Sequence, residues 1–165
     1  MVQSISQPTV AIITVTYNCY DFIEAYLDSI YPLLTSNKYH LILVDNNSSD
    51  GSVRLIKQHT TLHNAESHIT LYCEKTNVGF GKGCNRAATI AEEKKIPYLW
   101  FLNPDTTINQ NSGSALLSLL QNDKNIHFAG SLLSNEQGEI RAGGFRFPSI
   151  TNILISTSRL KILDR

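Results

Sequence analysis

Apolar and polar positions alternate along the chain with two periods, one typical of strands and one typical of helices. Residues 9–16 form a β-branched run with few charges, as expected for a strand buried on both faces. Residues 22–30 then place apolar side chains at helical spacing, after a D-x-x-E start signal at Asp21 and Glu24. The same alternation continues downstream. It predicts further strands at 39–44, 69–73, 98–102 and 127–133, and helices around 53–56, 87–91 and 116–120.

Repeated strand–helix alternation predicts an α/β fold, a three-layer sandwich with a mostly parallel central sheet and helices on both faces. The pattern changes after Leu133. Residues 135–138 read as a hairpin-like turn, 143–148 are irregular, and 150–163 mix apolar and basic residues with a weak helical pattern. We therefore expect one domain over 8–148, followed by the beginning of a further region at 149–165 that is cut short.

Composition and charge exclude several functional classes. The 165 residues carry 14 basic and 14 acidic side chains, so the formal net charge is 0, which argues against nucleic-acid binding. Residues 1–8 lack the features of a signal peptide, and no stretch approaches the ~18 apolar residues of a membrane span. Three cysteines without C-x-x-C spacing indicate reduced thiols. Together these features predict a cytoplasmic protein.

The strongest chemical signal is the segment L-N-P-D-T at 102–106, which directly follows the apolar run at 98–101. A strand that ends on a carboxylate places an oxygen ligand at the carboxyl edge of the sheet, where ligands bind in open α/β folds. Aspartate is a natural ligand for Mg²⁺ or Mn²⁺. Because N-P-D is also ordinary turn chemistry, the weight of Asp105 depends on similar signals at other strand ends.

The first strand ends at Thr16, Tyr17 and Asn18. Tyr17 can offer an aromatic face to a nucleobase, and Asn18 can offer its amide to the backbone or to a ligand. The alternative is a tyrosine packed in the core and an asparagine that caps a helix.

The second strand ends in the polar run D-N-N-S-S-D-G at 45–51. The carboxylate of Asp45 and the amide of Asn46 can pair with the edge of a pyrimidine, because a carboxylate accepts a hydrogen bond from the ring N–H. The alternative is an Asx-rich turn in which Asp50 caps the next helix.

A glycine-rich segment follows the third strand. Gly79 and Gly81 let the backbone approach a diphosphate, the start of the next helix favours an anion, and Lys82 or Arg86 can add positive charge. The dinucleotide-binding fingerprint fails here, because its last glycine falls on Cys84 or on Arg86, and no P-loop G-K-[ST] occurs.

Four motifs, T-V-T-Y-N at 14–18, V-D-N-N-S-S-D-G at 44–51, N-V-G-F-G at 77–81 and N-P-D at 103–105, occur in the order seen in family 2 glycosyltransferases. The chain resembles the donor-binding part of their GT-A fold over about 8–148, with 149–165 as the start of a truncated acceptor-side region. It is most similar to the rhamnosyltransferase-like branch, which often carries N-P-D where other members have D-x-D.

The resemblance implies a set of site residues at the strand ends. Those around the base and ribose, or beside the diphosphate, are Thr16, Tyr17, Asn18, Asp45, Asn46, Gly79, Gly81, Lys82 and Asn103. Asp105 corresponds to the last carboxylate of D-x-D and would bind the diphosphate through Mg²⁺ or Mn²⁺. Asn103 replaces the first carboxylate of that motif, which bears on how strongly the protein depends on a metal.

The implied activity is transfer of a sugar, with inversion, from a nucleotide-diphosphate sugar such as dTDP-rhamnose to a polysaccharide or lipid-linked acceptor, in the cytoplasm and in peripheral contact with the inner face of the cell membrane. Family members carry an acidic general base in a later region, whereas the only acid after Pro148 here is Asp164. The alternative is therefore a truncated fragment that binds a nucleotide sugar without transferring it. A sugar-phosphate nucleotidyltransferase would need a glycine-rich basic loop after the first strand, and 16–19 is not one.

Two further groups have weaker signals. His59, His63 and His68 have a loosely metal-like spacing, but the polar, loop-like segment around them favours a solvated loop over a structural metal site. Cys84 is better explained as a packed thiol than as a nucleophile, because the sequence places no histidine partner beside it.

Overall fold

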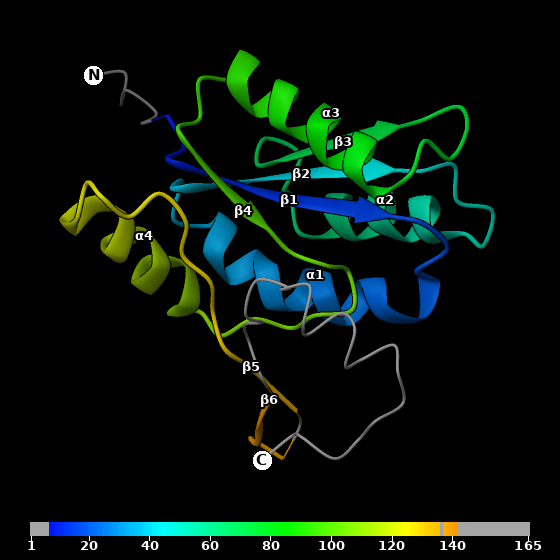
Figure 1. Ribbon diagram of the computed structural model, residues 1–165. Coiled ribbons are helices and arrows are strands. Elements are labelled where there is room, and N and C mark those ends of the chain that lie inside the picture. Colours follow the sequence, from blue (N-terminus) through cyan, green and yellow to red (C-terminus); the bar gives the residue numbers. More distant parts are fainter. Residues whose placement is uncertain (1–6, 136, 142–165) are drawn as a thin grey trace, which may run out of the picture. The chain divides into compact units, whose positions relative to one another are not determined.

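Four parallel strands form the central sheet of the first unit of the chain (Figure 1). The computed structural model describes residues 7–135 and 137–141. The chain divides into two compact units, 1–124 and 125–165. The strands are β1 (Val10–Thr16), β2 (Tyr39–Asp45), β3 (Ile69–Cys73) and β4 (Tyr98–Phe101), in the spatial order β3-β2-β1-β4. The pairing aligns Thr16 with Asp45 and Asp45 with Cys73, so β1, β2 and β3 end at the same level.

Helices cover both faces of the sheet, as the sequence predicts (Figure 1). They are α1 (Tyr20–Leu34), α2 (Ser52–Leu62), α3 (Phe80–Glu93) and α4 (Ser112–Asn122). α1 and α2 pack on one face, where their apolar side chains share a core with Ile12 and Leu41. α3 packs on the opposite face. There Ala87 and Ala91 share a second core with the residues of β1 and β2 that alternate with Ile12 and Leu41. The expected α/β three-layer sandwich is confirmed.

The strands β1 and β2 are buried at every position. Each contributes alternate side chains to two separate cores, which is why both read as continuous apolar runs rather than as alternating ones. β4 forms an edge of the described sheet, and its residue Phe101 is 51% exposed.

The second unit corrects one prediction. Residues 127–132 form no strand, and the short strand β5 (Leu133–Ser134) pairs antiparallel with β6 (Ile140–Arg141). The apolar run contains Gly130, which weakens a strand, and its residue Phe128 is 95% exposed. The turn predicted at 135–138 is confirmed by a hydrogen bond of 2.9 Å from the Gly138 N–H to the Asn135 carbonyl and by a φ of +79° at Gly138. The predicted elements at 143–163 and the boundary at 148–149 lie outside the described residues.

Two helix predictions differ in extent. The short helix expected at 53–56 extends over Ser52–Leu62. α1 continues to Leu34, beyond the expected span of 22–30, and Pro32 lies inside its last turn. Among the residues that the structure describes, no helix has the length and apolarity needed to cross a membrane.

α3 approaches the sheet closely at Gly83, and this contact generates a prediction about stability. A Cβ at Gly83 would lie 2.9 Å from Cγ1 of Val15, whereas a Cβ at Gly81 would meet no atom within 4 Å. Gly83→Ala should therefore push α3 away from β1 and lower the free energy of unfolding by about 1–3 kcal/mol. Gly81→Ala, the control, should leave it unchanged or raise it by up to about 1 kcal/mol. Equal urea midpoints for the two variants would contradict the close packing.

Candidate functional site

The carboxyl ends of the strands and the beginning of α3 meet at one edge of the sheet. In Figure 1 the arrows of β1 and β2 point to the side on which α1 and α3 begin. The Leu102 N–H donates to the Ile13 carbonyl at 3.0 Å, which extends the β1–β4 pairing and carries Asn103 and Asp105 toward this edge. Four segments that are distant in sequence thus reach the edge where ligands bind in open α/β sheets.

Asp45 is the buried centre of this edge. Only 1% of the residue is exposed. Its Oδ1 accepts hydrogen bonds from the Thr16 hydroxyl at 2.9 Å and from the Ser48 hydroxyl at 2.5 Å, and its Oδ2 accepts the Ser48 N–H at 2.8 Å. The carboxylate therefore fixes the end of β1 and the loop after β2, and these protein donors use most of its capacity to accept hydrogen bonds.

Asn46 differs from Asp45 in having an unused acceptor. Its N–H donates to the Thr16 carbonyl at 2.8 Å, and the residue is 2% exposed. Its Oδ1 is buried and has no hydrogen-bond partner among the described residues. Since buried acceptors almost always have a donor, this amide oxygen is a candidate contact for the N–H group of a ligand.

Tyr17 and Asn18 lie beside these groups and have different roles. Tyr17 is 53% exposed, so the alternative of a tyrosine in the core is wrong and its ring remains accessible. Asn18 has a φ of +48°, donates its N–H to the Ser48 hydroxyl, and accepts the Ser49 N–H at its Oδ1, both at 2.9 Å. Its amide oxygen thus joins two loops, and no hydrogen bond of that side chain to α1 is found among the described residues.

Asp50 caps the beginnings of two helices. Its Oδ2 accepts the Tyr20 N–H of α1 at 2.9 Å, and its Oδ1 accepts the Ser52 N–H of α2 at 2.9 Å and the Ser52 hydroxyl. The Ser52 Oγ in turn accepts the Cys19 N–H at 3.0 Å. Burial acts to raise the pKa of Asp50, but the hydrogen bonds from Ser52 and Tyr20 outweigh it and lower this pKa below its ordinary value. The capping role expected for Asp50 is confirmed and extends to α1.

The glycine-rich segment leaves room beside the first turn of α3. Gly79 has a φ of +86°, and its N–H donates to the Asn77 Oδ1 at 2.9 Å. Gly81 has no atom within 4 Å of the position of a Cβ, and Lys82 is exposed. Because the first N–H groups of a helix have no acceptor within it, this end of α3 can receive an anion.

The two cations of this segment differ in their surroundings. The Arg86 Nε lies 3.2 Å from Glu74 Oε1, and its guanidinium stacks over the Tyr72 ring at 5.0 Å. Within the described parts of the chain, Lys82 forms no ion pair. Lys82 rather than Arg86 is therefore the cation available to a ligand.

Burial raises the pKa of Cys84, as expected for the packed thiol that the sequence predicts.

Asn103 and Asp105 follow β4 in a turn closed by a hydrogen bond of 3.2 Å from the Thr106 N–H to the Asn103 carbonyl. Both residues are exposed. One carboxylate and one amide oxygen form a set of hard donors, which fits Mg²⁺ or Mn²⁺ bound together with the oxygens of a phosphate.

Two features of this structure were not predicted from the sequence. No role was expected for Ser48 and Ser52, whose hydroxyls link the loops of this edge. Three histidines were expected in a polar loop, whereas His59 lies in α2, His63 directly follows that helix, and both face Asp28 of α1. Serine and aspartate are common on surfaces and in turns, so only the tertiary arrangement distinguishes these residues.

A comparison with protein families matches residues 11–159 to the model of Glycosyl transferase family 2. Among the curated proteins, none matches the chain.

Solved structures with a similar fold include S. aureus TarS 1–349, with 21% identity and a TM-score of 0.58 over 69% of this chain. The same protein in complex with UDP matches with 20% identity and a TM-score of 0.57, also over 69% of this chain. The mannosyltransferase PcManGT from Pyrobaculum calidifontis, in complex with GDP-Man and Mn²⁺, matches with 23% identity and a TM-score of 0.59 over 70%. The matched region covers 32%, 32% and 33% of those chains, respectively, so this chain corresponds to about a third of their length.

Asp50 provides a test of how the loops of this edge are held. Asp50→Asn keeps one acceptor oxygen and loses the other, so we expect it to lower the free energy of unfolding at pH 7 by about 1 kcal/mol. The pKa of Asp50 is lowered by folding, so its contribution is present above the ordinary value of 3.8 and is lost as the pH falls below it. The difference in the free energy of unfolding between the wild type and Asp50→Asn, measured by urea denaturation, should therefore become smaller below that pH. Glu93→Gln, at an exposed carboxylate of α3, is the control; an equal effect from it would contradict the cap.

Proposed function

The chain belongs to glycosyl transferase family 2, and on that premise we propose that it binds a nucleotide-diphosphate sugar at the carboxyl edge of its sheet and presents the sugar for transfer. The observation that carries this proposal is the meeting of the ends of β1, β2 and β4 with the beginning of α3. That edge combines an accessible aromatic ring, a buried free acceptor, a helix N-terminus and an exposed carboxylate.

The base and ribose lie, in this proposal, against Tyr17 and the loop after β2. The exposed Tyr17 ring offers a face for stacking, and Asn46 Oδ1 lacks a donor that the N–H of a base can supply. Asp45 supports this pocket by fixing the end of β1 through Thr16, and one further hydrogen bond at its Oδ2 is compatible with its contacts. We propose uracil or thymine as the base, because its pairing edge offers one N–H to this small set of acceptors, whereas guanine adds an amino group that needs a further acceptor.

The diphosphate lies at the beginning of α3. The open space at Gly81 permits an anion to approach the backbone, and Lys82 adds a positive charge. Asn103 and Asp105 offer oxygen ligands, and they would hold Mg²⁺ or Mn²⁺ together with the phosphate oxygens. When bound, that cation supplies positive charge to the departing diphosphate.

The proposed reaction is an inverting transfer. An acceptor hydroxyl attacks the anomeric carbon, and its proton passes to a carboxylate base of the kind that family members carry in their later region. The bond from that carbon to the diphosphate oxygen breaks, and the positive end of the α3 dipole stabilises the departing anion. N-P-D at 103–105 supports dTDP-rhamnose as the first donor to test, and a polysaccharide or lipid-linked glycan at the inner face of the cell membrane as the acceptor.

Binding of the donor without transfer is the second candidate function. It is favoured by the residues that meet at this edge, since each has a proposed role toward the donor and none has one toward an acceptor hydroxyl. A turnover assay with dTDP-rhamnose and UDP-sugars, in the presence of an acceptor, separates the two functions.

Asp105 provides the first test of the donor site. In Mg²⁺, Asp105→Ala should weaken the binding of UDP or dTDP by about tenfold or more, which corresponds to about 1.4 kcal/mol. The difference should shrink when the metal is chelated, because the lost contact passes through the cation. Glu93→Ala removes an equal charge from the far end of α3 and should leave the affinity unchanged. Calorimetry that gives the same affinity with and without metal, in both wild type and Asp105→Ala, would exclude the ligand role.

The choice of base provides the second test. UDP and dTDP should raise the melting temperature more than GDP and ADP do at equal concentration. A nucleotide present at 100 times its Kd adds about 2.7 kcal/mol to the free energy of unfolding. Tyr17→Ala should reduce the shift for every nucleotide, since stacking on the ring does not depend on the identity of the base. Stabilisation by GDP or ADP that equals that by UDP would overturn the pyrimidine assignment and leave the diphosphate site intact.

A further inference from the structure

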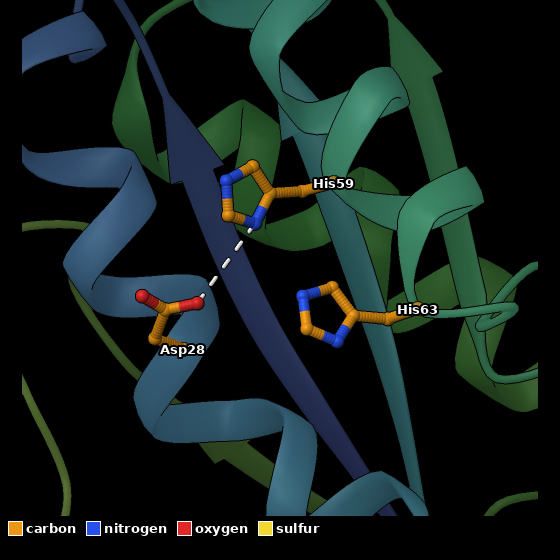
Figure 2. Close-up of side chains that lie close together, drawn as sticks. All are labelled: Asp28, His59 and His63. Atoms are coloured by element: carbon orange, nitrogen blue, oxygen red, sulfur yellow. Dashed lines mark ion pairs between the residues drawn. The ribbon is translucent and has the colours of Figure 1, made fainter.

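Three side chains that bind metals well face one another on the side of the sheet covered by α1 and α2. Figure 2 shows Asp28 of α1 opposite His59 of α2 and His63, which follows α2. One ligand atom from each residue lies within 4.8 Å of the other two. The two histidines are four positions apart, a spacing that places their side chains on the same face of a helix.

The hydrogen bonding of His59 leaves one ring nitrogen unsatisfied. Its Nε2 lies 3.2 Å from Glu24 Oε1, and its Nδ1 lies 3.9 Å from Asp28 Oδ1. The residue is only 8% exposed, and Nδ1 is buried without a hydrogen-bond partner among the described residues. When Nε2 carries the proton and donates it to Glu24, the lone pair of Nδ1 faces a carboxylate oxygen. Two acceptors that face each other in this way favour a proton or a metal cation between them.

The surroundings of His59 match those of histidine ligands in metalloproteins. Such ligands usually donate their second ring N–H to a carboxylate or carbonyl, which fixes the tautomer and the orientation of the ring. Glu24 is placed to accept that bond. His63 is also held, because the Tyr31 ring stacks on it with centroids 4.2 Å apart.

The spacing of the three ligand atoms is compatible with a tetrahedral ion after a small closure. Bonds of about 2.0–2.2 Å place the ligands of a tetrahedral zinc ion about 3.4 Å apart. The separations here reach 4.8 Å at most, and Asp28 is exposed, so its side chain can rotate toward the two histidines.

A pocket of about 460 Å³ lies beside the cluster. Asp28, Tyr31, His63 and His68 are among its lining residues, whereas His59 is not. Three protein ligands with the fourth direction facing this pocket would leave one coordination position for water or a small exchangeable ligand.

We propose that Asp28, His59 and His63 form a metal site for Zn²⁺ or a similar transition-metal ion, separate from the nucleotide-sugar site. Two imidazoles and one carboxylate favour such ions, whereas the oxygen ligands at Asp105 favour Mg²⁺ or Mn²⁺. The proposed site connects α1 with α2, and it does not depend on the proposed function. α2 begins at the edge with the donor residues and ends at the cluster, about 16 Å away along the helix axis.

The test is a titration of the full, chelator-treated chain with ZnCl₂ in the absence of nucleotide. Calorimetry measures the Zn²⁺ affinity, and thermal unfolding with and without Zn²⁺ measures the change in stability. The wild type should bind one Zn²⁺ at this site, and its melting temperature should rise. His63→Ala and Asp28→Asn, both at exposed positions that should tolerate the change, should weaken Zn²⁺ binding by about 100-fold or more. Glu24→Gln should weaken it by about 10–100-fold through the orientation of His59.

Two matched controls locate the site. His68→Ala removes a histidine of the same pocket, and Asp105→Ala removes the ligand proposed for the donor site; both should keep wild-type affinity for Zn²⁺. Tetrahedral Co²⁺ provides a second readout, because its visible absorption should appear in the wild type and disappear in His63→Ala.

Three outcomes would overturn the proposal. They are no Zn²⁺ binding by the wild type, unchanged Zn²⁺ affinity in His63→Ala, and loss of Zn²⁺ binding in Cys73→Ser while His63→Ala keeps it.

Discussion

The buried carboxylate of Asp45 is the constraint on which the edge of the sheet depends. A carboxylate that is 1% exposed must be surrounded by donors, and here the donors come from Thr16 at the end of β1 and from Ser48 in the loop after β2. Satisfying it requires both strands to end at the same level, and the pairing of Thr16 with Asp45 meets that requirement. The polar groups of two loops are thereby placed above a continuous apolar core.

The same edge separates residues that hold the loops from residues that remain open to a ligand. Asn18 and Asp50 direct their side-chain oxygens at backbone N–H groups of the neighbouring loop or helix. Among the described residues, no hydrogen bond of this kind engages the side chain of Tyr17, the side chain of Lys82 or the side-chain oxygen of Asn46. A rigid loop framework limits the entropy that a ligand must overcome on binding, so these internal hydrogen bonds serve the site even where they never touch the ligand.

The sequence predicted the layers of the fold because its signal is local. Strands buried on both faces read as apolar runs, and the intervening helices show a 3.6-residue period, so the order of elements through β4 could be assigned without tertiary information. The prediction at 127–133 was wrong because an apolar run becomes a strand only when a neighbouring strand pairs with it. The helix start signal at Asp21 and Glu24 marked the beginning of α1 correctly, but the hydrogen bonds that cap α1 come from Asp50 and Ser52 across the loop.

The candidate site shows the same division. Strand ends and glycine spacing placed Asp45, Gly79 and Asp105 at one edge, since topology alone brings these positions together. Which groups are engaged internally could not be predicted, because that depends on rotamers and on loop contacts such as those of Ser48. The pairing of Asp28 with two histidines was equally inaccessible, because α1 and α2 are joined only through packing against the sheet.

The most direct test of the central claim is a titration of the isotope-labelled chain with UDP and Mg²⁺, followed by amide resonances in NMR spectra. We expect shifts concentrated at residues 17–18, 46–49, 79–82 and 103–106, at the carboxyl edge of the sheet. Residues 59–68, beside the histidine cluster, should be unaffected. Shifts confined to 59–68, or no shifts at saturating nucleotide, would contradict the placement of the nucleotide-sugar site.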